Sequence, residues 1–292
     1  MGKIVRARAA FTMTELLTAI AIVALLSALL FPVFVSSRKA SLKSSCSVRL
    51  KQTLTATQLY TAEYDDRFMP AQQDVSGRGT YLTDKRWPQL LMPYSRNEEV
   101  FRCPSDRSHL GRERVFDPDL VPLASQMRSY EQAERANFGY NAFNLAPARG
   151  TLTGWVSQPL AQTDLANPSQ TLVFAETAWM LRGGEPVGGG NFVASPPCRF
   201  SSDRSPAIGD IPPAMGSNVG GDAAWKEVIG GPKTSATTTG GVFAFHTQAM
   251  NVGYADGSVR SQSIRNLAKG CNVQPGWNGT IQDLEGYAWD VK

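Results

Sequence analysis

The longest apolar run of the chain lies near its amino terminus. Residues 16–35 contain no charged side chain, and a helix of this length, at about 1.5 Å per residue, reaches roughly the 30 Å thickness of a hydrocarbon core. The preceding residues 1–10 carry Lys3, Arg6 and Arg8 and no acid, the composition of a short cytoplasmic leader. We therefore predict a leader over 1–10 and one membrane-spanning helix over 11–35.

A helical period continues beyond the apolar run. Leu42, Cys46, Leu50 and Leu54 recur every fourth residue, and basic residues alternate with them. Side chains at this spacing lie on one face of a helix. The pattern predicts an amphipathic continuation of the same helix over residues 36–66, with one half in a membrane or filament and the other on a sheet.

Strand patterns dominate the rest of the chain, residues 67–292. Thr171–Trp179 is apolar at successive positions, which indicates a strand that is either buried on both faces or twisted at an edge of the sheet. Residues 250–255 and 258–263 are two further runs joined by Asp256-Gly257, the dipeptide typical of a type I′ hairpin turn. We expect a hairpin with its tip at Asp256-Gly257.

Residues 183–241 contain repeated Gly-Gly pieces and several prolines, without a periodic element. This composition indicates a large loop-rich insertion. The predicted fold class is α+β, with a long amino-terminal helix packed on an antiparallel β-sheet that carries this insertion.

Composition and charge exclude several functions. The formal net charge is +4 across 292 residues, and the basic residues are scattered, so no nucleic-acid-binding surface is expected. The chain contains no Gly-x-Ser-x-Gly, no His-Glu-x-x-His, no P-loop and no dinucleotide fingerprint. We expect a protein that is not an enzyme and that has no cofactor and no metal.

Two features of the apolar segment have alternative interpretations. The segment could be a cleaved secretory signal, although its run is longer than usual and residues 36–40 form a poor cleavage site. Glu15 stands at the start of the run, where its carboxylate either stays hydrated at the interface or requires a cationic partner.

Residues 10–17, Ala-Phe-Thr-Met-Thr-Glu-Leu-Leu, resemble the processing motif of type IV prepilins and type II secretion pseudopilins. The resemblance implies a pilin-like fold and cleavage between Ala10 and Phe11 by a prepilin peptidase, which then methylates the new amine. It also makes Glu15 the carboxylate that guides assembly and Pro32 the proline that kinks the membrane helix. The family usually has glycine before the cut, so Ala10 departs from the pattern.

Later segments resemble a group of prepilin-like proteins with a carboxyl-terminal His-x9-Asp-Gly segment. The matching pieces are residues 46–52, 60–70, 87–94, 101–106 and 138–141, and the motif itself is His246, Asp256 and Gly257. A functional interpretation places His246 in a ligand or metal site. A structural interpretation, which we favour, assigns Asp256-Gly257 to the turn, because one histidine and one carboxylate are two ligands short of a tetrahedral site.

The four cysteines, Cys46, Cys103, Cys198 and Cys271, form no Cys-x-x-Cys motif. In an exported body they suggest two disulfides with three possible connectivities, while four reduced thiols are the alternative. The family resemblance favours Cys46 with Cys103, which leaves Cys198 with Cys271.

Together these observations predict a structural subunit, a pseudopilin or minor pilin, that assembles with other pilin or pseudopilin subunits. We expect a single-pass inner-membrane protein with an extracytoplasmic body, found in a periplasmic or cell-surface filament after assembly. The alternative is an anchored extracytoplasmic binding protein or enzyme that uses prepilin processing only for export. Its candidate ligand carboxylates are Asp203, Asp210 and Asp222, which lack a ligand spacing.

Overall fold

The computed structural model describes residues 12–70, 72–73, 85–106, 136–151, 154–182, 185–187, 190–208, 225 and 238–290. The chain divides into two compact units, Met1–Leu42 and Lys43–Lys292, and each is described by itself. Ala10, Phe11, Asp210 and Asp222 lie outside the described residues.

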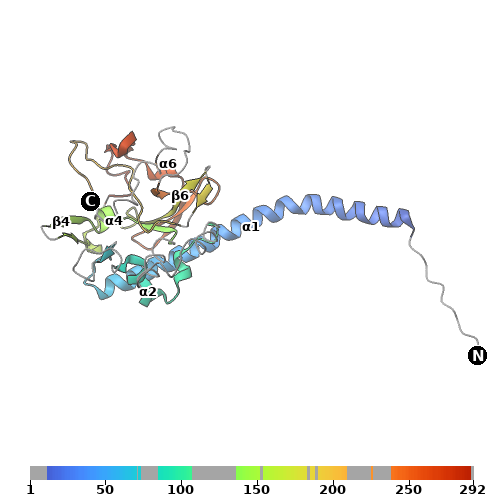
Figure 1. Ribbon diagram of the computed structural model, residues 1–292, viewed down its shortest axis with the longest axis horizontal. Coiled ribbons are helices and arrows are strands. Elements are labelled where there is room, and N and C mark those ends of the chain that lie inside the picture. The colour runs from blue at the N-terminus through green and yellow to red at the C-terminus, as the bar shows by residue number, and fades with distance from the viewer. Residues whose placement is uncertain are drawn as a thin grey trace, which may run out of the picture. The chain divides into compact units, whose positions relative to one another are not determined.

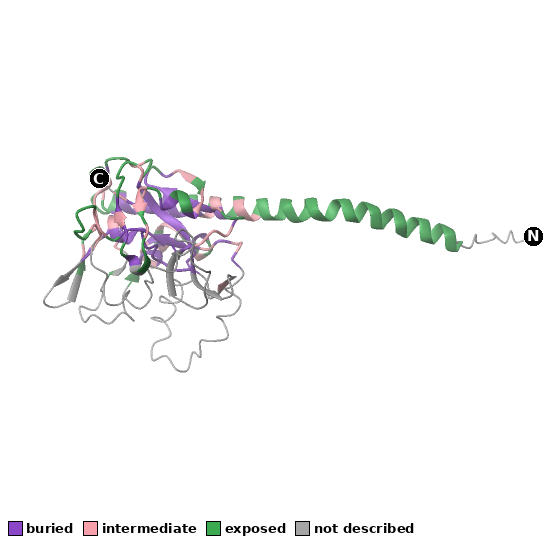
Figure 2. Cartoon of the chain, turned by 90° about the horizontal axis from the view of Figure 1, so that it is seen from above, coloured by how far each residue is buried: buried purple, intermediate pink, exposed green. Residues whose placement is uncertain are grey.

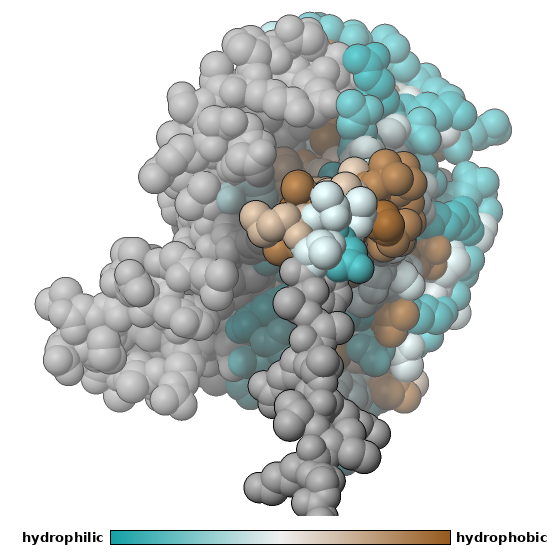
Figure 3. All heavy atoms as spheres, turned by 90° about the vertical axis from the view of Figure 1, so that its right-hand side faces the viewer, coloured by the Kyte–Doolittle hydropathy of each residue, from teal (hydrophilic) through white to brown (hydrophobic). Residues whose placement is uncertain are grey.

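The first unit contains the beginning of helix α1 (Met13–Glu63). Every residue from 12 to 41 is exposed (Figure 2). In Figure 3 the helix end that faces the viewer has white and teal residues at its tip and brown, apolar residues on both sides. By length and composition, α1 is long and apolar enough to cross a membrane. Pro32 lies inside the helix.

The second unit is built around an antiparallel sheet, which confirms the α+β prediction. Its strands are β3 (Phe138–Tyr140), β6 (Leu172–Arg182), β7 (Glu185–Val187), β8 (Thr238–Val242), β9 (Met250–Tyr254) and β10 (Val259–Gln262). The order is β10-β9-β6-β3, with β7 and β8 pairing with the far end of the long strand β6 (Figure 1). All of these strand pairs are antiparallel.

Shorter elements complete this unit. The helices are α2 (Trp87–Ser95), η1 (Glu98–Phe101), α4 (Ala142–Leu145), η4 (Gln162–Asp164), α6 (Ile264–Leu267) and η5 (Pro275–Trp277). Two-stranded pairs are formed by β1 (Gln72–Gln73) with β2 (Lys85–Arg86), β4 (Ala148–Thr151) with β5 (Gly154–Ser157), and β11 (Cys271–Asn272) with β12 (Thr280–Ile281).

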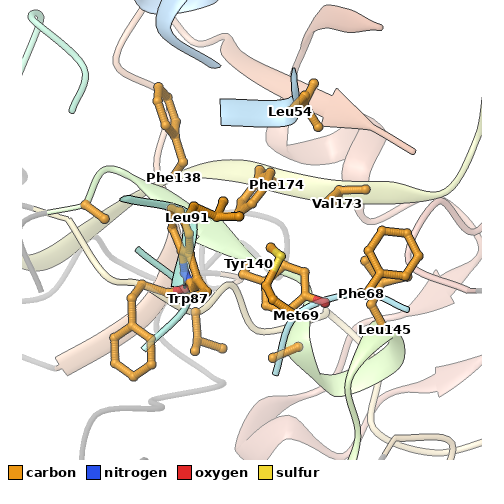
Figure 4. Packing of buried hydrophobic residues seen from close by; sticks show 14 of the residues in the cluster. Leu54, Phe68, Met69, Trp87, Leu91, Phe138, Tyr140, Leu145, Val173 and Phe174 are labelled. Atoms are coloured by element: carbon orange, nitrogen blue, oxygen red, sulfur yellow. Dashed lines mark hydrogen bonds between the residues drawn. The ribbon is translucent and has the colours of Figure 1, made fainter. Parts of the chain in front are cut away.

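The second half of α1 covers one face of the sheet. Cys46, Leu50 and Leu54 are at most 2% exposed and belong to the same apolar cluster as Phe174 of β6. Trp87, Tyr140 and Phe174 converge in this cluster from α2, β3 and β6 (Figure 4), with ring centroids 4.8 Å apart for Trp87–Phe174 and 5.6 Å apart for Tyr140–Phe174. The residues of the predicted four-residue period therefore form the face of the helix that packs on the sheet.

Alternate residues of strand β9 face the two opposite sides of the sheet. Met250, Val252 and Tyr254 belong to a second buried cluster, together with Trp289 and residues of α6. Gly253 points to the other face, where an added Cβ would lie 2.9 Å from the Cδ1 atom of Leu54. The glycine therefore allows α1 to approach the sheet closely.

The predicted hairpin is present between β9 and β10, but its turn differs in type. Gly257 has a φ of +79°, and Asp256 is not among the residues with positive φ. The Gly257 amide donates to the Tyr254 carbonyl, and the Tyr254 amide donates to the Ser258 carbonyl. These bonds define a type I turn followed by a glycine bulge, which replaces the expected type I′ turn because only one residue is left-handed.

The segment predicted as an insertion contains sheet and core residues. Strands β7 and β8 lie within or at the ends of 183–241, and residues 190–198 are buried. Val193 makes a parallel bridge with Tyr140 of β3. The absence of a periodic pattern therefore did not mean an absence of core packing in this segment.

Candidate functional site

A buried carboxylate occupies the centre of the sheet. Glu176 is 0% exposed, and it lies on β6 where the alternation of the strand points its side chain to the face covered by α1. The pairing of β6 with β9 shifts register between Leu172 and Phe174. Val173 and Phe174 consequently both belong to the apolar cluster under α1, and the regular alternation of side chains begins after them. The site is built around this side chain.

Two cysteines lie against Glu176. Cys46 is on the packing face of α1, and its Sγ is 2.7 Å from the Oε1 atom of Glu176. Cys103 follows η1 and forms a disulfide with Cys46. The second disulfide joins Cys198 to Cys271. The connectivity expected from the family resemblance is thus confirmed for both pairs.

Polar contacts hold the loop that carries Cys103. Arg49 of α1 donates from Nη1 to the carbonyls of Glu99 and Arg102, at 2.9 and 3.1 Å. The Cys103 amide donates to Oδ1 of Asn137 at 2.9 Å, and the amide group of Asn137 donates to Asp106. The loop is therefore tied both to the helix and to the segment that enters β3.

His246 reaches the same carboxylate from a turn before β9. Its Nε2 is 3.1 Å from Oε1 of Glu176 and 3.7 Å from Sγ of Cys103, and its Nδ1 is 3.4 Å from the Ser105 hydroxyl. The turn places Thr247 and Gln248 at φ values of +51° and +65°. Two non-glycine residues in the left-handed region cost of order 1 kcal/mol or more each, so surrounding contacts must hold the turn.

Burial dominates the electrostatics of the site. Removal from water raises the pKa of Glu176, and hydrogen bonds from His246 and Asn251 only partly oppose this shift. Asn251 of β9 donates from Nδ2 to Oε1 at 2.8 Å. Within the described part of the chain, Oε2 of Glu176 is buried without a hydrogen-bond partner. The site therefore contains an acceptor that none of the described protein groups satisfies.

The structure separates the two parts of the His-x9-Asp-Gly motif. His246 precedes β9 and Asp256 follows it, so the length of the strand lies between them. Asp256 accepts from the Ser258 amide at 2.8 Å and lies 3.7 Å from Arg260. The carboxylate beside His246 is Glu176, and the interpretation of Asp256-Gly257 as turn residues agrees with the hairpin.

Glu15 lies in the first turn of α1 and contacts Thr12. Its carboxylate accepts from the Thr12 amide at 2.9 Å and from the Thr12 hydroxyl at 2.7 Å, while the Glu15 amide lies 3.3 Å from that hydroxyl. This reciprocal pair is a capping box, which satisfies donors at the start of the helix. Thr-x-x-Glu before an apolar run is its sequence signal, and the sequence interpretation missed it.

The remaining predicted carboxylate, Asp203, makes a local turn contact. Its Oδ1 accepts from the amide and hydroxyl of Ser205, and these hydrogen bonds lower its pKa. Nearby, Arg204 lines a polar hollow of about 430 Å³ together with residues of the β11–β12 region: Asn272, Gln274, Pro275, Asn278 and Thr280. This hollow is a second candidate site.

Sequence reasoning did not find Glu176 or Asn251 as site residues. The available signal was an acid in the middle of a largely apolar strand, because such a carboxylate needs a partner.

A search of family models, curated proteins and solved structures found no match to this chain.

Proposed function

We propose that this chain is a prepilin-like structural subunit, a pseudopilin or minor pilin, of a type II secretion or type IV pilus-like filament. The observation that carries the proposal is an apolar helix segment, exposed over residues 12–41, whose continuation packs on an antiparallel sheet. An apolar surface of this size requires a membrane or neighbouring helices to cover it. In a pilin-like subunit, the lipid bilayer covers this surface before assembly, and neighbouring helices of the filament core cover it afterwards.

Processing belongs to the same proposal. A prepilin peptidase cuts between Ala10 and Phe11, and the new amine meets the Glu15 carboxylate of its own or a neighbouring subunit during assembly. In the isolated chain this carboxylate is engaged by Thr12. In an apolar environment an ammonium group binds a carboxylate more strongly than a hydroxyl does. During assembly the Glu15 carboxylate therefore exchanges the Thr12 hydroxyl for the new amine.

Substitutions at the capping box separate capping from charge. Glu15→Gln retains an acceptor suited to the capping box but removes the charge, whereas Thr12→Ala keeps the charge and removes the hydroxyl. We expect both variants to be cleaved, Thr12→Ala to enter filaments, and Glu15→Gln to remain in the membrane. The measurement is the amount of chain in sheared filaments relative to membranes, with mass spectrometry of the mature amino terminus.

A methylated Phe11 at the mature terminus supports the proposal. A mature chain that starts beyond residue 35 contradicts it, because the segment is then a removed signal peptide. Normal assembly of Glu15→Gln contradicts the role assigned to the carboxylate.

A second function is an anchored extracytoplasmic binding protein. The observation in its favour is the polar hollow beside Arg204, whose lining offers amide and guanidinium donors. Under this alternative, Glu15→Gln leaves binding by the body unchanged and affects no filament. The same set of variants therefore distinguishes the two functions.

A further inference from the structure

The buried cluster of Cys46, Cys103, Glu176 and His246 has the composition of a metal site. The four donor atoms lie within 4.8 Å of one another, and all four residues are buried. They come from four separate segments: α1, the loop after η1, β6 and the turn before β9. Of the His-x9-Asp-Gly motif only His246 belongs to this cluster, and Glu176 and the two cysteines supply the other three donors.

We propose that these four side chains bind one Zn²⁺ when the cysteines are reduced, and that the Cys46–Cys103 disulfide is the metal-free form of the same site. Two sulfurs, one imidazole and one carboxylate form a closed tetrahedral set of the kind that zinc takes in structural sites. Thiolate and imidazole ligands select zinc over magnesium and calcium. The proposal is independent of the function of the amino-terminal helix.

Two of the donor separations lie close to those of such a site, whereas Cys46 Sγ and Glu176 Oε1, which are 2.7 Å apart, must move apart on binding. Bonds of about 2.0–2.3 Å in a tetrahedron place neighbouring donors about 3.3–3.8 Å apart. His246 Nε2 is 3.1 Å from Glu176 Oε1 and 3.7 Å from Cys103 Sγ. Two sulfurs bound to one zinc ion lie about 1.7 Å farther apart than two sulfurs in a disulfide bond. Reduction of the disulfide allows the sulfurs to separate by this amount.

The surroundings of Glu176 favour a cation. A sulfur in a disulfide carries no hydrogen, so Cys46 donates nothing to the carboxylate oxygen that lies 2.7 Å away. The other oxygen, Oε2, is buried and lacks a hydrogen-bond partner within the described structure. A bound cation compensates a buried carboxylate that protein donors leave incompletely satisfied.

Outer contacts orient the proposed ligands. Nδ1 of His246 lies 3.4 Å from the Ser105 hydroxyl, which leaves Nε2 for the metal. Asn251 donates to Glu176 at 2.8 Å and fixes the carboxylate. Histidine and carboxylate ligands held by such hydrogen bonds are characteristic of metal sites.

The two forms interconvert by balanced chemistry. On binding, the two thiols release two protons and Zn²⁺ is held by two thiolates, the Glu176 carboxylate and neutral His246. On oxidation by a disulfide, two thiolates pass two electrons to it and the Cys46–Cys103 bond forms. The oxidant leaves as two thiolates, which take up two protons from solvent, and Zn²⁺ is released. The oxidant is a protein or small-molecule disulfide.

The test uses the full chain in detergent, reduced and freed of metal, and titrated with Co²⁺ and then Zn²⁺. We expect one Co²⁺ per chain with a thiolate charge-transfer band and tetrahedral visible bands, displaced by Zn²⁺. Oxidised glutathione should release one Zn²⁺ per chain. No stoichiometric binding by the reduced chain, or equal binding by the oxidised chain, overturns the proposal.

Variants assign the ligands. Glu176→Gln and His246→Ala should each weaken Zn²⁺ binding by about 10- to 100-fold or more. The matched control is the double variant Cys198→Ser and Cys271→Ser, which removes the other disulfide and should leave the stoichiometry and the cobalt spectrum unchanged. Unaltered affinity in both single variants means that the thiols bind alone, and it overturns the four-ligand site. Circular dichroism identifies variants that fail to fold, and the wild-type titration stands without them.

Discussion

Glu176 illustrates how one side chain can define a site inside a core. Its strand neighbours Ala175 and Thr177 are buried, and its own side chain is 0% exposed. The cost of burying a carboxylate is offset only by partners, and His246 and Asn251 are the side chains that hydrogen-bond Oε1. The disulfide sulfur of Cys46 lies against the same oxygen without donating to it. These side chains come from distant parts of the chain. Four segments of the chain therefore meet at the Glu176 carboxylate.

Asp256 gives a pH-dependent prediction at the same scale. Burial alone would raise its pKa, but hydrogen bonds from Ser258 and the charges of Arg260 and Lys51 outweigh burial and lower it. A carboxyl with a lowered folded-state pKa stabilises the fold above its unfolded pKa, and this contribution is lost as the pH falls through the folded value. Asp256→Asn should therefore lower the free energy of unfolding by about 0.5 kcal/mol near neutral pH, since the site is partly exposed.

Urea unfolding at several pH values measures this effect. The difference between Asp256→Asn and wild type should shrink in acid, where the wild-type carboxyl is protonated, because asparagine retains the oxygen that accepts from Ser258. An equal difference at every pH contradicts the electrostatic explanation.

At the scale of elements, α1 combines two surfaces in one helix. Its residues 12–41 are exposed and mostly apolar, whereas its later residues present Cys46, Leu50 and Leu54 to the sheet. Lys51 also donates from Nζ to the Gly257 carbonyl at the tip of the β9–β10 hairpin. A change on the packing face should therefore act on the stability of the body.

Leu50→Ala tests this packing. Leu50 is 0% exposed in the cluster beneath α1, so its truncation should lower the free energy of unfolding by about 2–5 kcal/mol. Val48 is 55% exposed on the same helix, and Val48→Ala should change stability by less than about 0.5 kcal/mol. Similar losses in both variants would contradict the assignment of the buried face; chemical denaturation supplies the values.

At the scale of the whole molecule, the second unit contains its own core. Both apolar clusters are built entirely from residues at or after Cys46. A domain with a complete core can fold by itself. The described residues of the amino-terminal unit, 12–42, form an exposed apolar helix segment.

A chain that begins at Lys43 should therefore fold without detergent. We expect a monodisperse protein with near-ultraviolet circular dichroism and one cooperative urea transition. The full chain should require detergent, because its exposed apolar helix has no partner in water. Aggregation of the shorter chain, or a transition without cooperativity, would show that the body depends on the first unit.

Local patterns in the sequence predicted the elements. The uncharged run of 16–35, the four-residue period through Leu54, the apolar strand around Val173 and the Asp256-Gly257 hairpin all reflect interactions between near neighbours, and all appear in the structure. Turn type was less predictable, since Asp-Gly suits several turns and the register between β9 and β10 selected one.

The sequence by itself determined the α+β class and the long apolar helix, and the family resemblance favoured the pairing of Cys46 with Cys103 that the structure then showed. Only the tertiary structure placed Glu176, His246, Cys46 and Cys103 together, and it showed sheet strands within the glycine-rich segment. The physical reason is range: periodicity records contacts a few residues apart, whereas residues 46, 103, 176 and 246 meet only after helix and strands have packed across the whole second unit.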